Sequence, residues 1–101
     1  MNYMKAEKMK VLLVATVQSH ICQFHKPLVA MLHEHGCEVH VAARNNLAEK
    51  NGLKLDFVEQ VFDVPFQRSP FSPKNLGAYK QLKKIIDEGN YDVVHCNTPC
   101  L

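Results

Sequence analysis

Apolar and polar positions divide the chain into alternating strand-like and helix-like segments. Residues 10–17 form an unbroken aliphatic run, which is typical of a strand covered on both faces of a parallel sheet. Residues 37–44 alternate valine with polar side chains and predict a second strand, less deeply covered than the first. β-Branched and aromatic residues predict a third strand over residues 58–64, before Pro65, and a buried fourth strand over residues 91–96.

The intervening segments carry apolar residues at helical spacing. A helix predicted up to Gly36 has one apolar face, which consists of Phe24, Leu28, Met31 and Leu32. A short helix is predicted over residues 46–52. A further helix is predicted to have Ser72 as its cap, Pro73 at its first position and an end near Gly89. Its apolar face is predicted to consist of Leu76, Tyr79, Leu82 and Ile86.

This alternation predicts an α/β fold, a Rossmann-like doubly wound parallel sheet of four strands with helices on both faces. The expected strand order is 3-2-1-4, which makes the first and fourth strands neighbours. The chain leaves these two strands in opposite directions, so a crevice is expected at their carboxyl ends. The polar segments 18–25 and 97–101, both expected to be loops, would meet at that crevice.

Size and charge narrow the range of functions. The chain has 101 residues and a net charge of +2 that is spread evenly, which argues against a nucleic-acid surface. We expect residues 1–9 to be a flexible lead-in and residues 10–101 to be part of one domain. The 4 cysteines include no CxxC pair and favour reduced, mostly buried thiols. The apolar run 11–17 is too short to cross a bilayer, and we expect a cytoplasmic protein.

Several common nucleotide-binding and hydrolytic motifs are missing from the sequence. The turn after the first strand, QSHICQFHKP, contains no glycine, whereas a dinucleotide-binding turn needs glycines for close approach to a pyrophosphate. The sequence also contains neither a GxxxxGK[ST] phosphate loop nor a GxSxG elbow. Although the chain has 6 histidines, their spacing matches no zinc pattern, so we expect no metal site.

Three stretches together resemble a known family. They are KVLLVATVQSHICQFHKPLVAMLHEHGCEVHVAA, PFQRSPFSPKNLGAYKQLKKII and YDVVHCNTP, and they lie within residues 10–99. The chain resembles the N-terminal, acceptor-side domains of GT-B-fold glycosyltransferases of the family 4 type, found in bacterial capsular and exopolysaccharide biosynthesis. The resemblance implies sugar transfer from a nucleotide-sugar donor to a glycan or lipid-linked acceptor, often without a metal ion. It also implies that the C-terminal donor domain is absent from these 101 residues, which would hold no cofactor of their own.

The resemblance also suggests site residues, and the acceptor-binding candidates are Ser19, His20, Arg68, Asn97 and Thr98. Asn97 stands where the family frequently has the second histidine of His-x-His-x-Pro. An amide orients a hydroxyl but cannot take its proton at neutral pH. The catalytic base is therefore unknown, with His20 or the donor phosphate as candidates. The Arg68 guanidinium suits a phosphate or carboxylate, although a surface ion pair is an equal alternative.

Other interpretations stay open at this stage. The chain could be the non-catalytic, acceptor-binding half of a split transferase, or a generic flavodoxin-like module that binds a small molecule. We expect these residues alone not to transfer sugar, and we expect self-association through an exposed edge of the fourth strand. Lys80, Lys83 and Lys84 favour a solvated helix face, with peripheral contact to the inner membrane face as the alternative.

Overall fold

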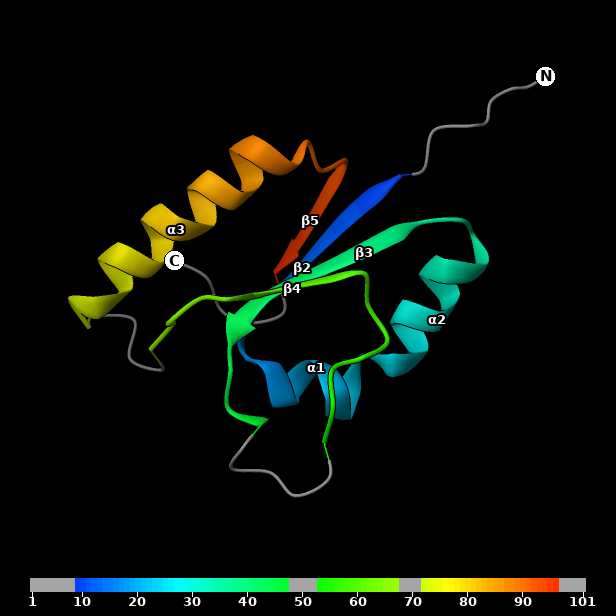
Figure 1. Ribbon diagram of the computed structural model, residues 1–101, viewed down its shortest axis with the longest axis horizontal. Coiled ribbons are helices and arrows are strands. Elements are labelled where there is room, and N and C mark those ends of the chain that lie inside the picture. Colours follow the sequence, from blue (N-terminus) through cyan, green and yellow to red (C-terminus); the bar gives the residue numbers. More distant parts are fainter. Residues whose placement is uncertain (1–8, 48–52, 68–71, 97–101) are drawn as a thin grey trace.

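The computed structural model describes residues 9–47, 53–67 and 72–96. Its strands and helices alternate along the chain, with two successive helices after the first strand (Figure 1). In chain order the elements are β2 (Lys10–Val17), α1 (Gln18–Phe24), α2 (Lys26–Glu34), β3 (Glu38–Arg44), β4 (Gln60–Asp63), α3 (Lys74–Gly89) and β5 (Val93–Cys96).

The four strands form one parallel sheet in the order β4-β3-β2-β5. This is the predicted order 3-2-1-4, so the α/β prediction is confirmed. Val11 pairs with Val39 on one side and with Val93 on the other, which makes β2 a central strand. The continuous aliphatic sequence of β2 reflects this position, because β2 has a strand on each side and helices cover both of its faces.

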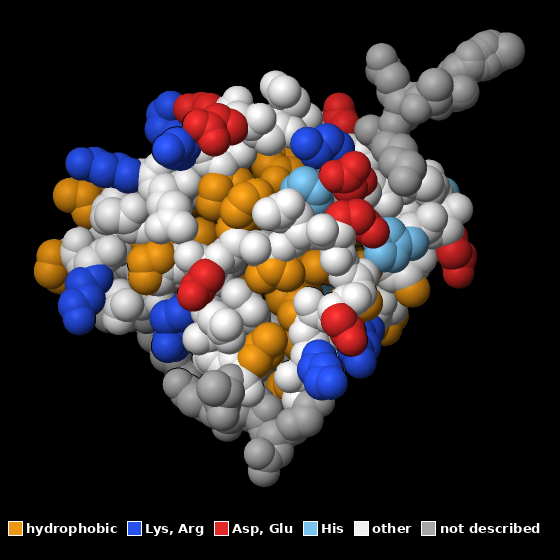
Figure 2. Space-filling view, viewed as in Figure 1, with side chains coloured by type: hydrophobic (Ala, Val, Ile, Leu, Met, Phe, Trp, Pro, Cys, Tyr) orange, Lys and Arg blue, Asp and Glu red, His pale blue; other side chains and the backbone are white. Residues whose placement is uncertain are grey.

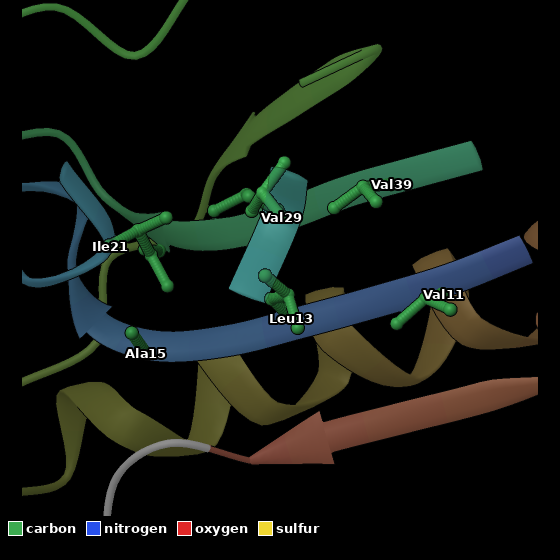
Figure 3. Close-up of a cluster of buried hydrophobic side chains, with 8 residues drawn as sticks. Val11, Leu13, Ala15, Ile21, Val29 and Val39 are labelled. Atoms are coloured by element: carbon green, nitrogen blue, oxygen red, sulfur yellow. The ribbon is translucent and has the colours of Figure 1, made fainter. Parts of the chain in front are cut away.

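One hydrophobic core lies between the sheet and the α1–α2 pair. Alternate residues of β2 and β3 point to this side, where they meet Ile21 of α1 and Val29 of α2 (Figure 3). The buried members are Val11, Leu13, Ala15, Ile21, Val29, Val39, Val41 and Ala43. The second core covers the opposite face under α3, with buried Leu12, Val14, Ala42, Val64, Phe66 and Ala78. Helices therefore pack on both faces, as a doubly wound sheet requires.

The predicted helix ends are largely confirmed. Pro27 lies in the first turn of α2, where its missing N–H breaks no helical hydrogen bond. Gly36 follows α2 with φ of 80°, a left-handed conformation that glycine adopts without a Cβ clash. Asn90 is the C-cap of α3 and adopts the same left-handed backbone conformation, with φ of 52°. At the start of α3 the prediction is off by one residue, because Pro73 is the N-cap and the helix begins at Lys74.

The predicted loop over residues 18–25 is wrong, because residues 18–24 form α1. Ile21 and Cys22 of α1 are buried, and this packing stabilises a helix too short to be stable by itself. The predicted apolar face of the next helix is also partly wrong. Phe24 belongs to α1 and is 66% exposed, and Met31 is 48% exposed. Val29, which was not assigned to that face, is the fully buried residue of α2.

The face of α3 needs a similar correction. Leu76 is 63% exposed, whereas Asn75 and Ala78 are the buried residues of this helix. Tyr79 and Leu82 pack against the second core as predicted. The buried stripe is therefore rotated toward Ala78, a small residue that lets the helix lie close to the sheet.

The depth of two strands also differs from the prediction. The interior of β3 is as fully buried as that of β2, because α2 covers one of its faces and β4 protects its edge. In contrast, β5 is exposed along its whole length, including Val93 and Val94, because it is an edge strand. The prediction for its burial is wrong. The short helix predicted over residues 46–52 falls mainly outside the described residues, as does most of the 1–9 lead-in.

A polar network closes the amino edge of the sheet. His40 shares one hydrogen bond of 2.7 Å between its Nδ1 and the Tyr91 hydroxyl, and another of 2.5 Å between its Nε2 and Glu38 Oε2. Lys10 Nζ donates to the Gly89 carbonyl at 2.6 Å and lies 5.1 Å from the centroid of the Tyr91 ring. The network joins β2 and β3 to the end of α3.

Candidate functional site at the carboxyl edge of the sheet

The carboxyl ends of all four strands share one edge of the sheet, because every pairing is parallel. At this edge β2 continues into α1, which packs on one face of the sheet, whereas α3, the helix before β5, packs on the other face. The position between β2 and β5 is therefore the topological switch point, where open α/β sheets bind ligands. The adjacency of the first and fourth strands, on which the predicted site depends, is confirmed.

Ser19 is the second residue of α1, just after β2, and is 4% exposed. Its backbone N–H donates to Asn46 Oδ1 at 3.0 Å, and its Oγ accepts a 2.8 Å hydrogen bond from Asn46 Nδ2. The two bonds fix the first turn of α1 against the segment that follows β3. Because Oγ accepts from Asn46, the Ser19 hydroxyl proton is still available as a donor.

Gln18 adds a second connection between the same strands. Its side chain is buried, and Nε2 donates to the carbonyl of Ala43 near the end of β3 at 3.2 Å. Neither Gln18 nor Asn46 is among the site residues predicted from the sequence. The available signal in the sequence was their position, since each is a polar residue just beyond a predicted strand; the structure adds that both are buried.

His20 lies on α1 next to two other aromatic rings. Its ring centroid is 5.1 Å from that of Phe24 and 5.1 Å from that of His25. Burial lowers the pKa of His20 below its usual value of 6.5, and the nearby His25 lowers this pKa further. A neutral imidazole at physiological pH can accept a proton, which is the property a general base needs.

Three of the predicted site residues belong to segments that the structure does not describe. Arg68, Asn97 and Thr98 lie outside the described residues, so their positions stay predictions. The described part of β5 ends at Cys96, which pairs with Val14 of the central strand. Ser19 and His20 are therefore the two candidates whose surroundings the structure describes.

Further polar side chains fix the loops after β3 and β4. Asp63, the last residue of β4, accepts a 2.9 Å hydrogen bond from the backbone N–H of Asn45. Asn75 in the first turn of α3 accepts from the Gln67 N–H at 2.7 Å and donates to the Gln67 carbonyl at 3.4 Å. The carboxyl edge is therefore held by side-chain to backbone hydrogen bonds from several elements.

An open groove of about 340 Å³ lies elsewhere, along α2. Lys26, Val29, Ala30, His33, Asp56 and Phe57 line it, and none of the predicted site residues takes part. Within residues 9–47, 53–67 and 72–96, no group of three or more His, Cys, Asp or Glu side chains could hold a metal ion. On the face in Figure 2, basic and acidic side chains are interspersed, without a large surface of one sign.

Comparison with known proteins agrees with the resemblance seen in the sequence. The family described as Glycosyl transferase 4-like matches residues 10–100. The chain belongs to this family. It is also similar to a Bacillus subtilis (strain 168) protein named "Putative glycosyltransferase EpsD", with 47% identity over 90 residues. That match covers 89% of this chain but only 22% of EpsD. No solved structure matches the chain.

Within the described part of the glycosyl transferase 4-like chain, no helix has the length and apolar character to span a membrane.

Proposed function

We propose that this chain is the acceptor-side part of a glycosyltransferase that moves a sugar from a nucleotide-sugar donor to a glycan or lipid-linked acceptor. The observation that carries the proposal is the pairing of β2 with β5, which puts the start of α1 at the switch point of a glycosyl transferase 4-like domain. The matched part of the chain corresponds to only 22% of EpsD. Sugar transfer by the whole enzyme is therefore part of what we propose.

In this proposal His20 receives the proton of the acceptor hydroxyl, and Ser19 orients the acceptor by donating its hydroxyl proton. The lowered pKa of His20 supports this role, because a base must be unprotonated before it reacts. Arg68, Asn97 and Thr98 would complete the acceptor site from the loops after β4 and β5. The donor would bind in a separate C-terminal domain, and the reaction would need no metal ion.

The proposal extends to the surroundings of the protein. We place it in the cytoplasm, with peripheral contact at the inner membrane face when the acceptor is lipid-linked. The position of β5 at the edge of the sheet, with exposed Val93 and Val94, supports self-association, since edge strands are common sites of pairing between chains. Light scattering should then give a mass above that of one chain, rising with concentration; a constant monomer mass would contradict this part.

Acceptor binding can be tested with residues 1–101. A panel of oligosaccharides of increasing length is titrated into ¹⁵N-labelled protein, and the amide shifts of Ser19 and His20 are followed by NMR. We expect saturable shifts at these residues and no sugar transfer from a panel of nucleotide sugars. His20→Gln should weaken binding, whereas His35→Gln, which changes an exposed histidine beyond the end of α2, should not.

Two outcomes would contradict the proposed function. Shifts confined to the groove along α2 would move the binding site away from the carboxyl edge. Equal affinity of the wild type and the His20→Gln variant would remove His20 from the site.

A further inference from the structure

Arg44 lies at the same edge as the candidate acceptor site and is absent from the predicted site residues. It is the last residue of β3 and pairs with Val17, the last residue of β2. Its neighbours in sequence already belong to this edge, because Asn45 bonds to Asp63 and Asn46 bonds to Ser19. The Arg44 side chain therefore starts from the strand ends that position α1.

The charge of Arg44 has no partner among the described residues. No acidic side chain in that part of the chain forms an ion pair with it, and its Nε is buried without a hydrogen-bond acceptor. Asp63, the acidic residue at the end of the adjacent strand, accepts its hydrogen bond from the backbone of Asn45 instead. A partly buried guanidinium with an unpaired N–H is unfavourable, and such a group calls for an explanation in a native fold.

We propose that Arg44 binds a phosphate group of a diphosphate-bearing substrate at the carboxyl edge. Arginine is suited to this task, because its planar guanidinium can donate two parallel N–H bonds to phosphate oxygens. The terminal Nη groups donate to the anion, whose negative charge neutralises a guanidinium that has no ion-pair partner among the described residues. The inference rests on the proposed function for the class of substrate, since a nucleotide sugar and a lipid-linked acceptor both carry diphosphate.

Inorganic pyrophosphate is the first probe. It is titrated into ¹⁵N-labelled protein, and both backbone amides and the Arg44 Nε–H signal are followed by NMR. We expect saturable shifts centred on residues 43–46 and at least a tenfold loss of affinity in Arg44→Gln. Arg44→Lys should keep part of the affinity, because it keeps the charge but loses the two-pronged geometry.

Lys84→Gln is the matched control, because it removes one positive charge from the exposed surface of α3. Its affinity for pyrophosphate should stay within twofold of the wild type. Equal losses in Arg44→Gln and Lys84→Gln would overturn the proposal by showing a general charge effect. Absence of binding, or shifts centred away from residues 43–46, would also overturn it. If Arg44→Gln does not fold, Arg44→Lys and the wild-type Arg44 Nε–H shift decide the question.

Two further probes distinguish the source of the diphosphate. UDP represents the donor, and geranyl diphosphate represents a lipid-linked acceptor. If Arg44→Gln lowers the affinity for one probe more than for the other, the site is assigned to the substrate that this probe represents. An equal loss of affinity for both probes supports recognition of the diphosphate alone. Unchanged affinity for both would overturn the proposal. Pyrophosphate binding does not depend on the oligosaccharide titration, so either hypothesis can fail while the other stands.

Discussion

Gly89 in the last turn of α3 is required by the close approach of Tyr91. A Cβ at this position would lie 2.7 Å from Tyr91 Cζ and 2.8 Å from Cδ2, and closer still to Cε2. The ring is not free to move, because its hydroxyl is bonded to His40 and Lys10 lies over its face. Gly89→Ala must therefore displace a side chain that the amino-edge network holds in place.

Gly77 provides the matched control in the same helix. No heavy atom lies within 4 Å of a Cβ built at Gly77. Gly77→Ala should stabilise the protein by about 0.5–1 kcal/mol, which is the usual gain in helix propensity. Gly89→Ala should gain no more than this amount and lose about 1–3 kcal/mol to overpacking and a disturbed hydrogen bond. We expect the two variants to differ by about 2 kcal/mol in the free energy of unfolding.

Urea unfolding followed by circular dichroism measures the difference, with equal m-values as the test that the same transition is compared. For a domain of this size, about 2 kcal/mol corresponds to roughly 10 °C in melting temperature. The clash also predicts coupling, so Gly89→Ala should cost much less in a Tyr91→Ala background. The reasoning is refuted if Gly89→Ala is as stable as Gly77→Ala, or if its cost is the same in both backgrounds.

Three other predictions concern single side chains. Asn46→Ala should lower the free energy of unfolding by about 1–3 kcal/mol, because it leaves the Ser19 N–H buried without its acceptor; a wild-type urea midpoint would contradict this. Burial alone would raise the pKa of Glu59, but hydrogen bonds from the Val39 N–H and His33 hold this pKa below 4.5. Stability contributed by Glu59 should therefore be complete above pH 4.5 and be lost as the pH falls through the lowered pKa, and Glu59→Gln should make the acid loss shallower in pH-dependent unfolding. His25→Gln should raise the pKa of His20 toward 6.5 without reaching it, because burial remains; an unchanged pKa in an NMR titration would exclude the charge of His25 as a cause.

The sheet was predictable because its signal is repeated along the chain. Each strand shows either a continuous apolar run or an alternation of apolar and polar residues, and right-handed crossovers leave few topologies for four such strands. The resemblance of three separated stretches to one family then indicated the same fold independently. Agreement between the two lines of reasoning explains why the strand order was correct.

The helices show where pattern alone fails. α1 spans 7 residues, which is too short for a 3.6-residue period to be distinguished from a polar loop. In α2 and α3 more than one apolar stripe was possible, and tertiary packing selected Val29 and Ala78 rather than Met31 and Leu76. The predicted burial of β5 was wrong for a similar reason, because the burial of a strand depends on which elements pack beside it.

For the candidate site, the sequence predicted the position of Ser19 and His20 in the sheet better than it predicted their hydrogen-bond partners. Ser19 and His20 lie at the carboxyl edge because they directly follow β2. The bonds between Ser19 and Asn46 join positions 27 residues apart and depend on the register between β2 and β3. That Arg44 Nε has no acceptor among the described residues likewise emerges only from the folded arrangement around it.

The central place of β2 has a consequence for the order of events during synthesis. β2, β3 and β4 leave the ribosome first, and their contacts span short sections of chain. The partner on the other side of β2 arrives much later, since Lys10 and Asp92, which exchange hydrogen bonds at the start of that pairing, are 82 positions apart. Closing so long a loop is entropically slow, so the innermost strand of the sheet acquires its second neighbour last.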